Sequence, residues 1–143
     1  MRIKLEMPQY YHFETTLTVR ITDLNYGGHV GNEMLLVYAQ QARVEWLKQW
    51  GYGELTLAGK GIIMTDAGVV YQAEIHEGEV LTIGLAVQNL TKIGFDLYYQ
   101  VSNKATGKAV AKIKTGILCF DYTTKKIAPI PAEVVKKLQA LAQ

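Results

Sequence analysis

The sequence DLNYGGHVGN, residues 23–32, runs directly into a long and mostly apolar segment that ends at Trp50. Two adjacent glycines allow a tight chain reversal, and the apolar residues that follow recur on nearly every side of a helix. We therefore predict a loop over 23–31 and a helix over 32–50, with Asn32 as its N-cap and Gly51 just beyond its end. His29 then lies near the helix N-terminus, where free backbone N–H groups and the helix dipole favour negative charge.

Strands are predicted on both sides of this helix. Residues 13–21 alternate between apolar and polar side chains, as a half-buried strand does. Residues 61–71 are apolar on both faces apart from Thr65 and Asp66, which predicts a central strand. The remaining elements are strands at 80–90, 95–103 and 108–122, a hairpin turn at 104–107 and a short helix at 132–141. The side chains expected to face inward from the first two of these strands are Leu81, Ile83, Leu85, Val87, Phe95, Leu97, Tyr99 and Val101.

The order of these elements predicts an α+β fold. Short connections between the later strands favour an antiparallel meander, and we expect this sheet to wrap around the one long central helix. With 143 residues the chain is expected to form a single domain over 1–143. Because one sheet cannot cover a helix that is apolar on all sides, we also expect a partner subunit.

Composition narrows the classes of function. The net charge of +2 is too small to indicate nucleic-acid binding. The single cysteine, Cys119, excludes an intramolecular disulfide and is expected to fill the core, and three scattered histidines do not have zinc-site spacing, so no metal or cofactor is predicted. No apolar run approaches membrane-spanning length, and we expect a soluble cytoplasmic protein. The later lysines, from Lys104 to Lys137, are either a solvated face or a patch for an anionic ligand.

The loop and helix resemble the motif of the hotdog-fold acyl-CoA thioesterases of the 4-hydroxybenzoyl-CoA thioesterase type. The matching residues are Asp23, Gly28, His29, Val30, Asn32, Tyr38, Ala42, Arg43, Tyr71, Gly78, Ile130 and Pro131. The resemblance spans essentially the whole chain and implies a hotdog fold. It also implies an acyl-CoA or acyl-carrier-protein substrate, and a homodimer or homotetramer whose active site lies between subunits. In that arrangement Thr65 and Asp66 would meet the other subunit's His29 loop, with no nucleic acid or membrane as partner.

Three positions depart from the family motif. Asn25 replaces the second aspartate, Gln40 replaces the helix glutamate, and Gly31 replaces the first asparagine of a pair. Because an amide does not take a proton from water near neutral pH, the carboxylate mechanism of the family does not transfer to Asn25. Some acyl-carrier-protein thioesterases of this fold use Asn and His in this loop, so the resemblance still implies activity.

The candidate site residues each have a structural alternative. Backbone N–H groups of Gly31 and Asn32 are expected to form an oxyanion hole beside Gly28, or only to cap the helix. His29, kept neutral by the helix dipole, Asp66 in its apolar strand and Glu33 in the first helical turn are candidate proton acceptors. Their alternatives are a loop hydrogen bond for His29, backbone hydrogen bonds for Asp66 and a dipole interaction for Glu33.

Asn25 either orients the water or the substrate carbonyl, or simply shapes the loop as an Asx-turn residue. Tyr38 and Arg43 fit packing and surface pairing as well as the motif. Either Gln40 or Gln41 is expected to face a polar pocket or a partner subunit.

The leading hypothesis is therefore hydrolysis of an acyl thioester to a free acid and a thiol. One alternative is a binding protein for acyl thioesters that has lost hydrolysis, which the two amide replacements favour. The other is a hotdog hydratase or dehydratase, in which His29 and Asp66 would act together. Fold alone does not decide among them.

Overall fold

The computed structural model describes residues 2–141. The elements are β1 (Phe13–Thr18), a 3₁₀ turn η1 (Ile21–Asp23), α1 (Met34–Gln49), β2 (Gly61–Tyr71), β3 (Val80–Gln88), β4 (Gly94–Asn103), β5 (Ala109–Asp121), β6 (Lys126–Ile127) and α2 (Ala132–Leu141). The bounds predicted for β2 and α2 are confirmed, and those for β3, β4 and β5 differ by one or two residues.

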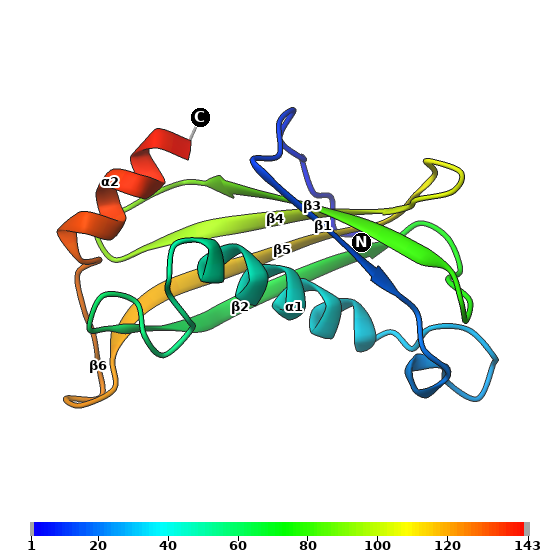
Figure 1. Ribbon diagram of the computed structural model, residues 1–143, viewed down its shortest axis with the longest axis horizontal. Coiled ribbons are helices and arrows are strands. Elements are labelled where there is room, and N and C mark those ends of the chain that lie inside the picture. Colours follow the sequence, from blue (N-terminus) through cyan, green and yellow to red (C-terminus); the bar gives the residue numbers. More distant parts are fainter. Residues whose placement is uncertain (1, 142–143) are drawn as a thin grey trace.

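One antiparallel sheet carries α1 across one of its faces (Figure 1). The strand order is β1-β3-β4-β5-β2, and the short β6 pairs with β5. The helix α2 lies at the end of the sheet where α1 finishes, and the loop before α1 lies at the opposite end (Figure 1). The predicted α+β arrangement of an antiparallel sheet around a long helix is confirmed.

The core lies between α1 and the sheet. The inward-facing residues predicted for β3 and β4, from Leu81 to Val101, are all buried. The Trp46 ring on α1 packs edge-on against Phe95 on β4, with ring centroids 6.2 Å apart, and Cys119 is buried as expected. Alternation along β3 and β4 thus supplies one wall of the core, and the buried face of α1 supplies the other.

The prediction that β2 is a central strand is wrong for this chain. Among the described residues 2–141 it pairs only with β5 and forms an edge of the sheet, with Met64 48% exposed. The predicted meander is correct for β3, β4 and β5 but wrong for β2. From β2 at one edge of the sheet the chain crosses over to β3, which lies on the other side of β4 and β5. Apolar residues on both faces of an edge strand need cover from elsewhere, since such an edge otherwise presents unpaired backbone groups.

The start of α1 also differs from the prediction. The helix begins at Met34 rather than Asn32, and Glu33 occupies the cap position without a capping side-chain hydrogen bond. The first strand ends at Thr18 instead of Ile21, because the chain turns into η1, where the N–H of Asp23 donates to the carbonyl of Arg20.

One side of α1 is exposed in the single chain. Val37 is 48% exposed, and Gln40 and Gln41 are exposed beside it. The opposite side buries residues such as Ala39 and Ala42 against the sheet. The expectation that one sheet leaves part of this helix uncovered is confirmed.

His12 makes folding depend on pH. Its Nε2 accepts the N–H of Val87 over 3.0 Å, which requires a neutral imidazole, and burial lowers the pKa of His12 below its ordinary value. The stability that the neutral form contributes is therefore present above pH 6.5, the ordinary value, and is lost as the pH falls from there through the folded-state pKa. We expect the melting temperature to fall over that range.

The variant His12→Gln retains an acceptor for Val87 but does not titrate, so its melting temperature should lose this part of the pH dependence. Identical pH profiles for wild type and His12→Gln would contradict this role for His12.

Candidate active site

The loop before α1 is closed by its own backbone. The N–H of Gly31 donates to the carbonyl of Asp23 over 3.1 Å, and the N–H of Asn25 donates to the carbonyl of His29 over 2.9 Å. Gly28 at the tip has φ of 80°, a left-handed conformation that glycine adopts without strain. The predicted loop is confirmed, and it holds Asn25 and His29 side by side.

Asp23 ties this loop to the helix. Its Oδ2 accepts the Tyr38 hydroxyl over 2.8 Å and the N–H of Arg20 over 3.1 Å. Burial, and then the neighbouring Asp23 carboxylate, raise the pKa of Tyr38, so the phenol stays protonated and remains a donor. Asp23 and Tyr38 are therefore loop-positioning residues.

The side chains of Asn25 and His29 converge on Gly27. Asn25 Oδ1 accepts the N–H of Gly27 over 2.8 Å, which is the Asx-turn geometry. A Cβ on Gly27 would lie 3.2 Å from Asn25 Oδ1 and 3.3 Å from His29 Nε2. The other ring nitrogen of His29, Nδ1, lies 3.3 Å from the carbonyl of Val30. A proton on Nδ1 satisfies that carbonyl and leaves Nε2 as an acceptor.

The approach to α1 has free donors. The N–H groups of Asn32 and Glu33 have no acceptor within residues 2–141, whereas that of Gly31 is already donated to Asp23. The Glu33 carboxylate folds back over Gly31, so that a Cβ there would lie 2.7 Å from Glu33 Oε1. A side chain at position 31 would therefore require the exposed Glu33 carboxylate to move. The Tyr71 hydroxyl donates to the carbonyl of Asn32 over 2.9 Å and joins the end of β2 to the helix start.

A cavity of about 270 Å³ opens at this helix start. Its lining residues come from the His29 loop, α1, the end of β2 with the segment after it, and β5: His29, Val30, Asn32, Leu35, Tyr71, Ala73, Glu74, Ile75 and Val110. Apolar walls with a few polar groups are typical of a small-molecule site. The predicted residues His29 and Asn32 are thus brought together in one cavity.

Sequence reasoning missed Glu74 as a member of this wall. It follows β2 closely, and the backbone N–H of Val30 donates to the carbonyl of Ile75 over 2.8 Å. That bond brings the segment after β2 against the His29 loop. The motif match at Tyr71 was the available signal, because it placed the end of β2 within the family pattern.

Thr65 and Asp66 lie elsewhere in the chain. The Asp66 side chain is 61% exposed and its Oδ1 lies 2.6 Å from the ammonium of Lys114, while the Thr65 hydroxyl donates to the carbonyl of Gly116 over 3.3 Å. Five residues of strand separate Asp66 from Tyr71, which is roughly 16 Å along β2. Asp66 is therefore exposed and paired with Lys114 rather than hydrogen-bonded to backbone groups, and a single chain does not bring it to the cavity.

A second cavity, of about 600 Å³, lies between α1 and the edge strand β2. Buried Arg43 forms part of its wall, with Nε 2.7 Å from Glu54 Oε2 and Nη1 donating to the Tyr99 hydroxyl over 2.9 Å. The Gln40 amide donates to Glu54 Oε1 over 3.0 Å. Gln40 therefore lies at a mostly apolar cavity, whose charged members are Arg43 and Glu54. Arg43 is buried, so its pair with Glu54 is not a surface pair.

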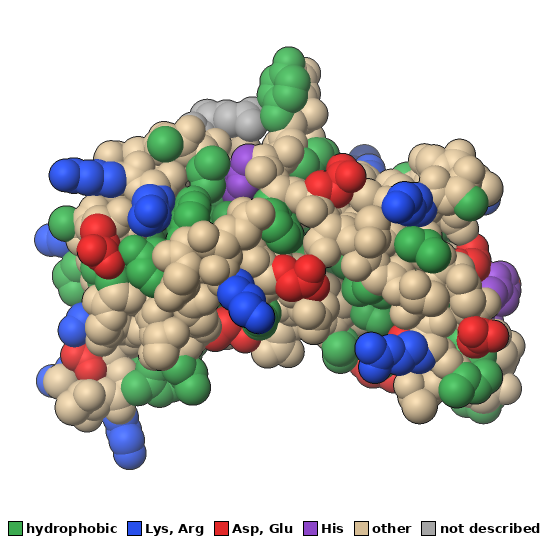
Figure 2. Space-filling model, viewed as in Figure 1, with side chains coloured by type: hydrophobic (Ala, Val, Ile, Leu, Met, Phe, Trp, Pro, Cys, Tyr) green, Lys and Arg blue, Asp and Glu red, His purple; other side chains and the backbone are tan. Residues whose placement is uncertain are grey.

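The later lysines do not form one patch. Lys104 and Lys108 flank the β4–β5 turn, whereas Lys136 and Lys137 lie on α2. Figure 1 places these two elements at opposite ends of the sheet, and Lys and Arg side chains are scattered over both ends of the face in Figure 2. Within residues 2–141, no group of three or more His, Cys, Asp or Glu side chains is arranged to hold a metal ion. No helix in that range has the length and apolar character needed to cross a membrane.

Known proteins share this architecture. Slr0204, a 1,4-dihydroxy-2-naphthoyl-CoA thioesterase from Synechocystis, superposes with a TM-score of 0.81 at 19% identity, covering 89% of this chain and 95% of its own. The gentisyl-coenzyme A thioesterase BH1999 superposes with a TM-score of 0.79 at 17% identity, covering 88% and 99%. The esterase candidate sll0410 from Synechocystis sp. is 25% identical over 133 residues, which span 89% of this chain and 80% of that protein.

The structural similarity confirms the hotdog fold, and at these identities it shows the fold alone. The sequence family described as the thioesterase-like superfamily matches residues 19–138, most of the chain. This match includes the His29 loop, α1 and all the later strands. The chain therefore belongs to the thioesterase-like superfamily.

Proposed function

We propose that this protein hydrolyses an acyl thioester, carried by CoA or by an acyl-carrier protein, to a free acid and a thiol. The observation that carries the proposal is the cavity at the start of α1, where His29 lines the wall beside the free N–H of Asn32. Membership of the thioesterase-like superfamily supports the same reaction.

The oxyanion is stabilised by backbone donors at the helix start. When water adds to the thioester carbonyl, negative charge develops on its oxygen, and the free N–H groups of Asn32 and Glu33, aided by the helix dipole, favour that charge. The N–H of Gly31 is donated to Asp23, so it closes the loop and is not one of these donors, while Gly28 lets the loop turn.

Asn25 and His29 orient the reactants. The amide oxygen of Asn25 accepts the N–H of Gly27 and shapes the loop that carries His29; Asn25 itself is not among the cavity-lining residues, so its NH₂ group would reach the substrate from the rim of the site. The Nε2 atom of His29 accepts a hydrogen bond from the attacking water. The water's proton then passes to His29 or to a carboxylate, for which the sequence offers the partner subunit's Asp66.

A second copy of the chain completes the site in this proposal. The edge strand β2 has a free side, and the exposed stretch around Met64 lies near the uncovered side of α1, with which it lines the larger cavity. Pairing of this edge in a homodimer or homotetramer would cover both surfaces and carry Thr65 and Asp66 toward another subunit's His29 loop.

Sedimentation velocity tests the assembly. We expect a species of two or four times the 16.0 kDa chain mass at micromolar concentration. A protein that sediments as a monomer at the concentration used for assays would contradict a site shared between subunits.

The reaction class is tested with a panel of thioesters. It should contain aliphatic acyl-CoAs, acyl-carrier-protein thioesters and aromatic acyl-CoAs, the last because both similar thioesterases are named for aromatic substrates. We expect thiol release with a matching yield of free acid. Binding of acyl-CoA without thiol release would identify a binding protein, the role that the amides at Asn25 and Gln40 favour. Formation of a 2-enoyl thioester, followed by its absorbance, would identify a hydratase or dehydratase.

A further inference from the structure

We propose that Glu74 is the carboxylate that takes the proton from the attacking water. This inference rests on the proposed hydrolysis and replaces His29 and Asp66 as the proton acceptor. Among the residues that line the cavity at the helix start, Glu74 is the one carboxylate. It therefore supplies, from another element, the acidic group that the amides Asn25 and Gln40 lack.

The position of Glu74 is fixed by its neighbours. Ile75 is buried, and its carbonyl accepts the N–H of Val30 over 2.8 Å. On the other side, the N–H groups of Gln72 and Ala73 both donate to the carbonyl of Val110, over 2.9 and 3.3 Å. Glu74 thus stands on a stretch of backbone that is attached both to the His29 loop and to β5.

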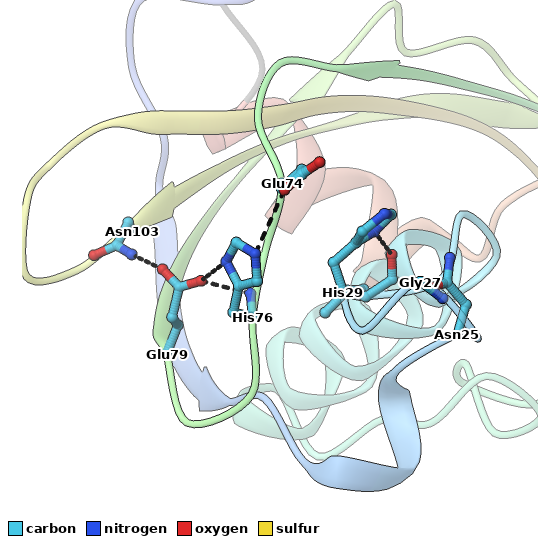
Figure 3. Close-up of polar contacts among 8 residues, drawn as sticks. Asn25, Gly27, His29, Glu74, His76, Glu79 and Asn103 are labelled. Carbon is cyan, nitrogen blue, oxygen red and sulfur yellow. Dashed lines mark hydrogen bonds and ion pairs between the residues drawn. The ribbon is translucent and has the colours of Figure 1, made fainter.

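The side chain of Glu74 lies beside His76 (Figure 3). One carboxylate oxygen, Oε2, lies 3.5 Å from His76 Nε2, and His76 Nδ1 lies 3.2 Å from Glu79 Oε1. Glu79 Oε1 also accepts the N–H of His76 over 2.5 Å, and the Asn103 amide donates to Glu79 Oε2. These contacts hold His76 against Glu79. Because a neutral imidazole that donates from Nδ1 has an acceptor at Nε2, it is the doubly protonated form of His76 that donates to Glu74 Oε2, while Glu74 Oε1 faces water.

Two other carboxylates of the chain are engaged by partners outside this cavity. Asp23 accepts hydrogen bonds from Tyr38 and Arg20, and Asp66 pairs with Lys114. The Glu33 carboxylate lies over Gly31 and is not among the residues that line the cavity. The Glu74 side chain is 67% exposed, so water reaches it and its charged form is solvated.

The reaction balances with Glu74 alone as the proton carrier. The water oxygen bonds to the thioester carbon as its proton moves to Glu74, and the carbonyl electron pair moves to the oxyanion. When the carbonyl re-forms, the carbon–sulfur bond breaks and the thiolate takes the proton from Glu74. One water and one thioester give one carboxylic acid and one thiol, and the Glu74 carboxylate is regenerated.

The test compares Glu74→Gln and Glu74→Asp with two other variants. Glu77→Gln is the matched control, because Glu77 is an exposed carboxylate three residues further along the same segment. Asp66→Asn tests the alternative acceptor. We expect Glu74→Gln to lower kcat by about 10²- to 10⁴-fold, the usual contribution of a general base, with KM changed by less than about threefold. Glu74→Asp should recover part of the loss, and Glu77→Gln should match wild type.

His76 acts in this scheme as a positioning residue. His76→Ala should lower kcat by about tenfold, and the double variant with Glu74→Gln should be no slower than Glu74→Gln alone, because residues that act as a unit are not additive. A merely structural contribution of His76 would instead add its effect to that of Glu74→Gln.

Two results overturn the assignment and are distinguishable. A Glu74→Gln variant that folds and turns over within about threefold of wild type, while Asp66→Asn or His29→Ala is impaired, removes Glu74 and leaves the proposed hydrolysis intact. A folded wild-type protein that releases no thiol from any thioester in the panel overturns both the hydrolysis and the role of Glu74.

Discussion

The variant His29→Ala is expected to lower kcat by about 10²- to 10⁴-fold in thiol-release assays, with a smaller change in KM. In the proposed site the Nε2 atom of His29 is the acceptor that aligns the attacking water, because Nδ1 faces the carbonyl of Val30. Removing the imidazole leaves the water unaligned but keeps the oxyanion donors of the helix start, so residual activity above the uncatalysed rate should remain.

Tyr26→Ala is the control for this measurement. Tyr26 belongs to the same loop, three residues before His29, but its side chain is fully exposed. It should retain wild-type kcat and KM. Equal activity in His29→Ala and wild type would show that the loop imidazole has no part in the reaction. Equal losses in both loop variants would point to a general disturbance of the loop.

The largest loss of stability is expected for Arg43→Met. Arg43 is 6% exposed, pairs with Glu54 and donates to Tyr99, whose hydroxyl is in turn 2.8 Å from that of Thr115. Methionine keeps the helix propensity and much of the volume but leaves the Glu54 carboxylate and the Tyr99 hydroxyl without their main partner. Breaking a buried pair in this way costs about 3–5 kcal/mol of unfolding free energy. For a chain of this size that lowers the melting temperature by roughly 10–20 °C.

Lys60→Met gives the matched comparison. Lys60 pairs with Asp121 over 3.2 Å, but its side chain is 34% exposed, and such pairs contribute about 0–1 kcal/mol. Thermal melts should therefore separate the two variants clearly. If the melting temperature of Arg43→Met lies within about 2 °C of wild type, the unfolding free energy has changed by well under 1 kcal/mol. The contacts of Arg43 with Glu54 and Tyr99 would then not stabilise the fold as predicted.

Periodicity predicted the elements whose pattern is local. The alternation through Leu81, Ile83, Leu85 and Val87 located β3 and its buried face, and the helical spacing of Val135, Leu138 and Leu141 located α2. These patterns succeed because burial of one face is decided by neighbours two to four residues away.

Pairing partners were not predictable in the same way. The apolar run of β2 is typical of a central strand, but it is equally typical of an edge strand that another chain covers. Both require apolar residues on two faces, and β2 is an edge strand here. Asn32 likewise has the right chemistry for an N-cap, but the backbone continues in a turn through Glu33 before the helix begins. The exact first residue of a helix depends on such local details of the backbone, which a hydrophobic pattern does not specify to within one or two residues.

In the candidate site, too, the residues of the local motif were predictable and those positioned by long-range contacts were not. The GGH loop and the family resemblance predicted His29, Asn25 and Asn32 as site residues. In the structure His29 and Asn32 line one cavity, and Asn25 is not among its lining residues. Glu74 was not predictable from the sequence. Its place in the cavity wall depends on the backbone hydrogen bond between Val30 and Ile75, which are 45 residues apart in the sequence. The occupied N–H of Gly31 was not predictable from the sequence either, since it follows from how the loop closes on Asp23.

The most direct test of the account is a crystal structure with an acyl-CoA analogue in which a methylene group replaces the thioester sulfur. The ketone oxygen then marks the position of the reacting carbonyl. We predict that it lies about 2.7–3.1 Å from the backbone nitrogen of Asn32, with its carbon in the cavity that His29 and Glu74 line. A ketone bound away from the start of α1, for example in the larger cavity beside Arg43, would contradict the proposed site.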